Sequence, residues 1–213
     1  MRMRMLFAGV CFLAAFAFGA GRGAKNLTGS FFDDFSSYPE GSTAKDNWSQ
    51  TGNVFVVHNG QFVWDGGKTD DWANPSPLVT TSKNFEMEFD YTRLPRTTRT
   101  FDACYLYFRH KSDSKGAYSV SWAGVEGGVA RVGWYVRGTN TEKSEGMDVP
   151  FPVDYLHTYR IHIRAIDGLV RLYIDNVLLI EEASIDPGAI LAGDFIVAST
   201  AAQIDNVSLQ LLP

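Results

Sequence analysis

The chain has 213 residues, with 24 acidic and 19 basic side chains and a formal net charge of −5. An acidic chain lacks the basic face that binding to a phosphate backbone requires, so this balance argues against a nucleic-acid partner. The length fits one domain with a sizeable hydrophobic core.

The first 24 residues have the layout of a secretory signal peptide. Two arginines precede an apolar run from Leu6 to Phe18, and small residues follow this run as far as Ala24. The run is too short to cross a bilayer comfortably, which argues against a membrane anchor. We therefore expect a secreted protein, extracellular or periplasmic, with no membrane span after the signal is removed. The mature domain is then residues 25–213.

Short segments rich in β-branched and aromatic residues follow one another through the mature chain, separated by Gly, Asn, Asp and Pro. Many short strands with this spacing are typical of an all-β sandwich or barrel. We expect strands within residues 53–59, 61–65, 84–93, 102–111, 116–124, 128–138, 157–166, 169–176, 177–183, 194–200 and 203–212. No repeat or linker separates these segments, so the sequence predicts a single all-β domain.

The segment 84–93, NFEMEFDYTR, places Glu86, Glu88 and Asp90 at alternate positions. Alternate side chains of a strand share one face, so the three carboxylates form a row over a hydrophobic underside. Rows of acids hydrolyse sugars in some enzymes. A catalytic row and a solvated outer face are therefore the two interpretations of this strand.

The segment 157–166, HTYRIHIRAI, carries a matching row of Arg160, His162 and Arg164 opposite an apolar face. If this strand pairs with the acidic one, the two rows form a ladder of opposite charges. Such cross-strand pairs each contribute roughly 0.2 to 1 kcal/mol on a solvated surface. This pairing favours the interpretation of the acidic row as a salt-bridged surface.

The order of the segments resembles the concanavalin A-like lectin and glucanase superfamily, a two-sheet antiparallel jelly roll. The resemblance rests on FFDDFSSYPEGS near the start, NFEMEFDYTR, HTYRIHIRAIDGLVRLYIDNVLLIE and the closing IDNVSL. Laminin-G-like modules and 3-keto-disaccharide hydrolase domains share the late pattern of a W/H-x-Y-R-I strand, a tight turn and L-Y-I-D-G. The resemblance implies a jelly-roll domain that binds a polysaccharide on its concave sheet. A glycan-degrading hydrolase and a structural or adhesive surface module are the alternatives.

Two enzymatic motifs of this superfamily are altered in the sequence. Keto-disaccharide hydrolases tend to carry N-S-G before x-F-F-R, and of that pattern only Arg109 carries over cleanly to FDACYLYFR. Laminarinase-type glycoside hydrolases use E-x-D-x-x-E or E-x-D-x-E, whereas E-M-E-F-D has Glu88 at the central Asp position and Asp90 at the final Glu position. Enzyme activity therefore stays open at this stage.

A glycan on the concave sheet would contact aromatic rings and arginine donors. On strands 103–110 and 129–137, alternation leaves one set of side chains opposite the core-facing residues. This set is Tyr105, Tyr107, Arg109, Arg131, Tyr135 and Arg137. Arginine binds carboxylate and sulfate groups bidentately, so a charged glycan is one expectation. Trp64 and Trp72 flank a loop that is expected to overhang one end of this face, and an ordinary outer face is the alternative.

Aspartates near both ends of the chain suggest a calcium site. FFDDF and QIDNV bring Asp33, Asp34 and Asp205 to positions that often meet in jelly rolls, and Ca²⁺ prefers carboxylate oxygens. Capping of turns by the same side chains is the competing interpretation. We expect no required cofactor, with a structural Ca²⁺ ion as the one candidate.

Three further side chains are assigned to the core. Cys104 lies within a strand-like segment whose neighbours predict a buried thiol and not a reactive one. Trp48 and Trp122 are also expected inside the sandwich.

Overall fold

A computed structural model describes residues 30–50, 55–64, 76–77, 84–95, 103–112, 118–137, 142–182, 194–199 and 201–213. The expected signal segment, residues 1–24, lies outside these ranges. Regular structure within the described residues consists of strands, and none of it is a helix long and apolar enough to cross a membrane. The strands are β1 (Ser30–Asp33), β2 (Trp48–Ser49), β3 (Phe55–His58), β4 (Gln61–Trp64), β5 (Ser76–Pro77), β6 (Phe85–Arg93), β7 (Ala103–Ser112), β8 (Tyr118–Glu126), β9 (Val129–Arg137), β10 (Glu142–Pro150), β11 (Thr158–Ile166), β12 (Leu169–Ile174), β13 (Val177–Glu182), β14 (Asp194–Ser199) and β15 (Ala202–Leu211).

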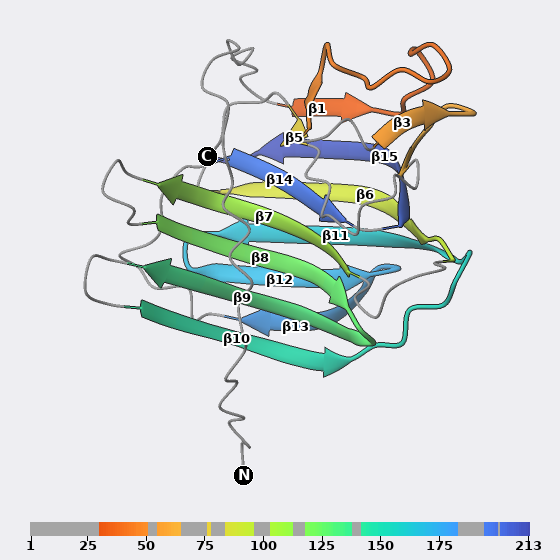
Figure 1. Cartoon of the computed structure of the whole chain (residues 1–213). Helices are drawn as coiled ribbons and strands as arrows, with labels where there is room; N and C mark the ends of the chain where they lie inside the picture. Colours follow the sequence, from red (N-terminus) through yellow and green to blue (C-terminus); the bar gives the residue numbers. More distant parts are fainter. Residues whose placement is uncertain are drawn as a thin grey trace.

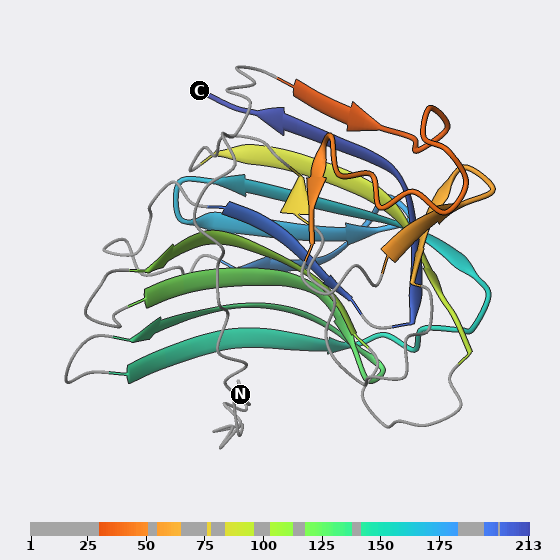
Figure 2. The ribbon, with the colours of Figure 1, turned by 45° about the horizontal axis from the view of Figure 1, so that its top comes forward.

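Two antiparallel sheets pack against each other as the layers of a sandwich (Figures 1 and 2). The larger, eight-stranded sheet has the order β13-β12-β11-β6-β15-β4-β3, and β1 pairs with β15 beside β4. The smaller, five-stranded sheet has the order β10-β9-β8-β7-β14. The strands β2 and β5 form a separate two-stranded sheet. The predicted all-β, two-sheet antiparallel sandwich is confirmed.

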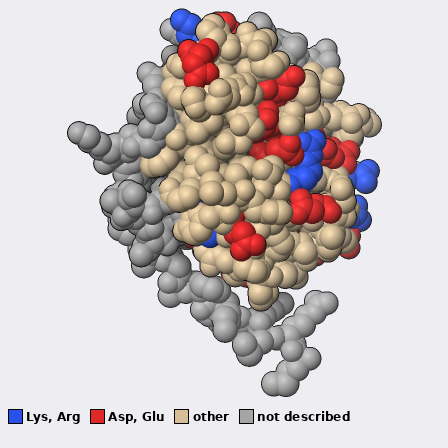
Figure 3. Space-filling view, turned by 90° about the vertical axis from the view of Figure 1, so that its right-hand side faces the viewer, with Lys and Arg blue, Asp and Glu red and all other residues tan. Residues whose placement is uncertain are grey.

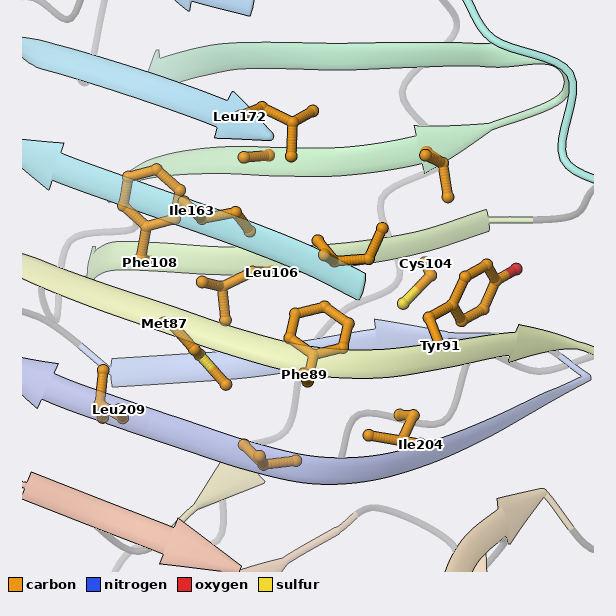
Figure 4. Packing of buried hydrophobic residues seen from close by; sticks show 14 of the residues in the cluster. Met87, Phe89, Tyr91, Cys104, Leu106, Phe108, Ile163, Leu172, Ile204 and Leu209 are labelled. Carbon is orange, nitrogen blue, oxygen red and sulfur yellow. The ribbon is translucent and has the colours of Figure 1, made fainter. Parts of the chain in front are cut away.

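The core lies between the two sheets and is built by period-two alternation on both of them. Met87, Phe89 and Tyr91 of β6 point to the same interior as Cys104 and Leu106 of β7 (Figure 4). Each of these five residues is buried, and Cys104 is a free thiol, as predicted. Because alternate residues of a strand lie on opposite faces, this inward set fixes which side chains each sheet presents to solvent.

Tight hairpins set the register between neighbouring strands. Asn59 and Gly60 join β3 to β4, Gly127 and Gly128 join β8 to β9, and both residues of each pair have positive φ. Two positive φ values in succession define the type I′ turn, whose twist matches that of the flanking strands. Asp167 and Gly168 form the two-residue turn between β11 and β12. The β8–β9 turn matters for function because it determines which side chains of those strands lie opposite each other.

Candidate functional site

Two tyrosines of β7 lie on the side of the five-stranded sheet that faces away from the eight-stranded sheet, which we call the outer face. Cys104, Leu106 and Phe108 belong to the core cluster. Tyr105 and Tyr107 alternate with them and lie outside that cluster, with ring centroids 5.9 Å apart. The tyrosines therefore share the outer face, as the alternation predicts.

Arg109 does not join the two tyrosines, contrary to the sequence-based expectation. A β-bulge interrupts the pairing of β7 with β8 between Phe108 and Lys111, and Arg109 has a left-handed backbone with φ of 54°. A bulge leaves residues without a partner on the next strand and redirects their side chains. Arg109 is 1% exposed. Burial lowers the pKa of its guanidinium to about 10, while the charge of Asp167 acts against this shift. Arg109 is thus unavailable to a ligand on the outer face.

Trp122 lies on the outer face, and its assignment to the core was wrong. Its side chain is half-buried and lies outside the core cluster. In register, Trp122 of β8 lies between Tyr107 of β7 and Gly133 of β9. A Cβ atom at Gly133 would be 2.6 Å from Cζ2 and 2.8 Å from Cε2 of the indole. The indole therefore lies over Gly133, in the space that any other residue at this position would fill with its side chain.

Next to Trp122 in the same row, strands β9 and β10 have glycines and therefore no side chains on the outer face. Gly133 pairs with Gly146 of the edge strand β10, so two neighbouring strands present only backbone at this level. Glycine inside a strand often marks a place where a ligand or another group approaches the backbone closely. Tyr107, Trp122, Gly133 and Gly146 form one row across four strands, which lie side by side in Figure 1.

A charged cluster forms the neighbouring row of the outer face. Arg131 of β9 lies opposite Asp148 of β10, and its Nε and Nη2 donate to the two carboxylate oxygens at 2.9 and 2.7 Å. On its other side Nη1 contacts Oε2 of Glu126 and donates to the Tyr105 hydroxyl at 3.4 Å. The Tyr105 hydroxyl donates to the same Glu126 oxygen. We call Tyr105, Glu126, Arg131 and Asp148 the Arg131 cluster.

The protonation states of the Arg131 cluster follow from these contacts. The hydrogen bonds to Asp148 raise the pKa of Arg131, although burial acts in the opposite direction. Burial, followed by the charge of Glu126, raises the pKa of Tyr105 far above its ordinary value. The guanidinium is therefore charged and the phenol is neutral at any physiological pH. A neutral phenol of this kind is a poor general base, which argues against proton abstraction by Tyr105.

The remaining predicted contact residues have different surroundings. Tyr135 of β9 lies outside the core cluster but is only 6% exposed. Arg137 ends β9, and its side chain is not described. Trp64 belongs to β4 of the eight-stranded sheet, where it packs against the core, so it does not overhang the outer face. Trp72 lies outside the described residues.

The acidic row of β6 pairs with the basic row of β11, which confirms the predicted ladder. The register sets Asp90 opposite Arg160 and Glu88 opposite His162. Arg160 donates to Asp90 at 3.0 Å and, diagonally, to Glu88 at 2.7 Å. His162 Nε2 lies 2.7 Å from a carboxylate oxygen of Glu86. On the surface seen in Figure 3, acidic and basic groups likewise lie next to one another.

The carboxylates of this ladder are all engaged by neighbouring side chains. A glycosidase uses one carboxyl group as an acid and a second as a nucleophile or base. The row on β6 already accepts hydrogen bonds from its neighbours, including Nδ2 of Asn206 to Asp90 at 2.7 Å. The row also belongs to the eight-stranded sheet, whereas the aromatic row belongs to the other sheet. The structure therefore separates the acidic row from the outer face.

Asp33, the first of the three proposed calcium ligands, uses both of its carboxylate oxygens within the protein. Oδ1 accepts the backbone N–H of Phe35 at 2.9 Å. Oδ2 accepts the Tyr38 hydroxyl at 2.7 Å and Nε1 of Trp48 at 2.8 Å. Trp48 is in the core, as predicted. These contacts are those of a capping carboxylate that fixes the chain after β1.

The other two proposed ligands also bond to their own neighbourhood. Asp34 accepts the backbone N–H and the hydroxyl of Ser36, and Asp205 accepts Nε2 of Gln61 at 3.2 Å. Burial raises the pKa of Asp205. In the described part of the chain, no group of three or more His, Cys, Asp or Glu side chains could hold a metal ion. The calcium site stays a prediction.

The fold of this protein is a two-sheet antiparallel jelly roll of the kind seen in concanavalin A-like lectins and glucanases. The sequence matches no family model and no curated protein. Among solved structures, the carbohydrate-binding module CBM66 from Bacillus subtilis is 16% identical with a TM-score of 0.53, over 77% of this chain and 95% of the module.

Two enzymes have the same fold. A β-glucanase from Bacillus licheniformis is 11% identical with a TM-score of 0.59, over 88% of this chain and 100% of the enzyme. LamA from Z. galactanivorans, solved in complex with laminaritriose and laminaritetraose, is 12% identical with a TM-score of 0.57, over 87% of this chain and 100% of LamA. At these identities the similarity establishes the fold.

Three residues of the outer face were missed by the sequence analysis. Trp122 resembles a core residue in a segment with other apolar residues. Glu126 ends β8 next to a glycine turn, and Asp148 lies in a strand without β-branched or aromatic clusters. The available signal was the alternation of Val120, Trp122 and Gly124 with Ser121 and Ala123, which sets the indole on the face opposite Ala123.

Proposed function

We propose that this protein is a secreted glycan-binding jelly-roll protein that holds a polysaccharide on the outer face of its five-stranded sheet. The observation that carries the proposal is the Trp122 indole, which lies over Gly133 and outside the hydrophobic core. An indole in this position offers a planar apolar surface to the C–H groups of a sugar ring, and it loses little side-chain entropy on binding because it already packs over Gly133.

The neighbouring groups supply the polar contacts that a sugar needs. Tyr107 is half-buried on the same row. The Arg131 cluster adds carboxylate groups that Arg131 already holds in place by hydrogen bonds, so little ordering is required when a ligand binds. The names of the solved relatives support the same class of ligand, because they include a carbohydrate-binding module and an enzyme complexed with laminari-oligosaccharides.

The alternative is that the Trp122 indole has a purely structural role. Aromatic side chains cover glycines in sheets and stabilise them by filling the missing volume. That role would explain the position of Trp122 without a ligand. The two roles predict different effects of substituting Trp122 on stability and on binding. Loss of a stabilising cover lowers stability alone, whereas loss of a central contact in a binding site typically costs about 2 kcal/mol or more of binding energy.

The test is a screen of soluble and insoluble polysaccharides, measured both for binding and for release of reducing ends. We expect the mature protein to bind at least one polysaccharide, and Trp122→Ala to weaken that binding at least tenfold. The matched control is Phe32→Ala, which removes a 63%-exposed aromatic ring from β1 of the other sheet. Equal binding by the two variants contradicts the proposed site. Release of reducing ends supports the alternative of a glycan-degrading enzyme.

A further inference from the structure

Among the side chains that the structure describes on the outer face, Arg131 is the arginine beside the aromatic row, and carboxylates of the protein already neutralise its charge. Both Nε and Nη2 bind Asp148, and Nη1 contacts Glu126 and Tyr105. A free arginine on a sugar-binding face attracts carboxylate or sulfate groups, because its fork of donors matches them. Here that fork is directed at two carboxylates of the protein itself.

The charge of the outer face is negative in the part that the structure describes. The charged side chains described on this face are Glu126, Arg131 and Asp148, which together carry a net charge of −1. The side chain of Asp148 is 31% exposed, so it meets solvent and any ligand at the edge of the row. Among the described side chains, an anionic sugar placed on the indole would therefore approach an acidic group, because the one described cation is already paired.

The cluster offers acceptors to a ligand. A carboxylate has about four acceptor positions. Asp148 uses one on each oxygen for Arg131, and Glu126 uses Oε2 for Arg131 and Tyr105. Within the described residues, Oε1 of Glu126 accepts no hydrogen bond. Accepting oxygens held rigidly beside an aromatic ring match groups that donate, and on a sugar these are hydroxyl groups.

From this charge and hydrogen-bonding pattern we infer that the outer face selects uncharged, hydroxyl-rich polysaccharides and rejects their sulfated or carboxylated counterparts. The inference rests on the proposed function and names its class of ligand. Arg131 is a positioning residue for this selectivity, because it holds the carboxylates of Asp148 and Glu126 beside the aromatic row. The two carboxylates accept the sugar hydroxyls, and they repel an anionic substituent.

The test compares ligands that differ in charge alone. The neutral polysaccharide that binds best in the screen is converted to its sulfated and its carboxymethylated derivative, and each is titrated against the mature protein at low and at high salt. We expect each derivative to bind at least tenfold more weakly at about 20 mM salt. The difference should shrink at about 1 M salt, where charges are screened beyond about 3 Å. Equal or tighter binding of the derivatives overturns the inference and leaves the proposed function in place.

A matched pair of variants tests the same point from the protein side. Asp148→Asn makes the cluster neutral, and Asp175→Asn removes the same charge from the β12–β13 turn of the other sheet. Asp148→Asn should reduce the discrimination between the neutral polysaccharide and its sulfated derivative at least threefold, while Asp175→Asn should leave it unchanged. Equal discrimination by both variants contradicts the inference. If no neutral or charged polysaccharide binds the parent protein, the proposed function itself is wrong.

Discussion

Adding a single methyl group at Gly133 tests the position of the indole without altering Trp122. The Cβ of Gly133→Ala would lie 2.6 Å from the indole and 2.8 Å from the carbonyl oxygen of Glu145. Carbon atoms in ordinary contact are about 3.5 to 4.0 Å apart, so the ring has to move by about 1 Å. Overpacking of this kind costs roughly 1 to 3 kcal/mol. The lower entropy of the unfolded chain returns about 0.4 to 1 kcal/mol.

We therefore expect Gly133→Ala to lower the free energy of unfolding by about 1 to 2 kcal/mol. In a domain of this size the melting temperature should fall by roughly 2 to 8 °C. Polysaccharide binding should weaken as well, because the displaced ring no longer lies flat over Gly133. Both quantities are measured on purified protein, by urea denaturation and by titration with the polysaccharide that binds the parent.

A double-mutant cycle isolates the contribution of the indole. In the Trp122→Ala background the ring is absent, so Gly133→Ala should cost less by about 1 kcal/mol, with only the contact to the Glu145 carbonyl remaining. The control is Gly146→Ala, whose Cβ would meet the Val132 carbonyl at 2.9 Å and no indole atom among its three nearest neighbours. Its cost should be the same in both backgrounds. If Gly133→Ala also costs the same in both, the ring does not lie over Gly133.

Four further predictions concern the rest of the molecule. Asp33→Ala leaves three donors without their acceptor, so it should cost at least about 3 kcal/mol in urea denaturation, and a cost below 1 kcal/mol contradicts the capping role. Glu88→Gln removes a partly exposed ion pair and should change the free energy of unfolding by less than about 1 kcal/mol. Burial raises the pKa of Asp205 in the folded state, so the ionised form of this carboxyl destabilises the fold. As the pH rises above about 4, the parent protein should therefore lose stability relative to Asp205→Asn. If the stability of the two proteins changes with pH in parallel, this prediction is wrong. If calcium binds near the two ends of the chain, excess chelator should lower the melting temperature, because an ion bound to the folded state stabilises it. An unchanged melting curve excludes that site.

Alternation made the sandwich and the charge ladder predictable from sequence. In β6 and β11 every second residue is buried, and the residues between them are acidic in one strand and basic in the other. Each strand therefore specifies its own inward face, and complementary charges specify the partner. The sequence could not specify the diagonal contact of Arg160 with Glu88, because the direction in which a long side chain leans depends on the packing around it.

The outer face was predicted less well because its determinants are not local. Arg109 follows the alternation in sequence, yet a bulge opposite β8 redirects it into the interior. Trp122 is apolar, and only its glycine partner on β9 shows why an indole fits there. Asp148 belongs to β10, which was not predicted as a strand. This edge strand has the sequence EKSEGMDVP. Charges on an edge strand discourage pairing with other chains, and the same charges remove the apolar pattern by which a strand is predicted from sequence.

The position of β15 has a consequence for how the chain reaches its fold. This strand follows all the others in sequence, yet it lies inside the eight-stranded sheet between β6 and the pair β1 and β4. Asn206 and Asp90, which bond across this junction, are 116 positions apart. Contacts between such distant segments are slow to form, since the loop entropy is lost before the contact is gained. Until β15 has been synthesised, β6 has no neighbour on that side. The eight-stranded sheet can therefore be completed only after the last strand of the chain has been made.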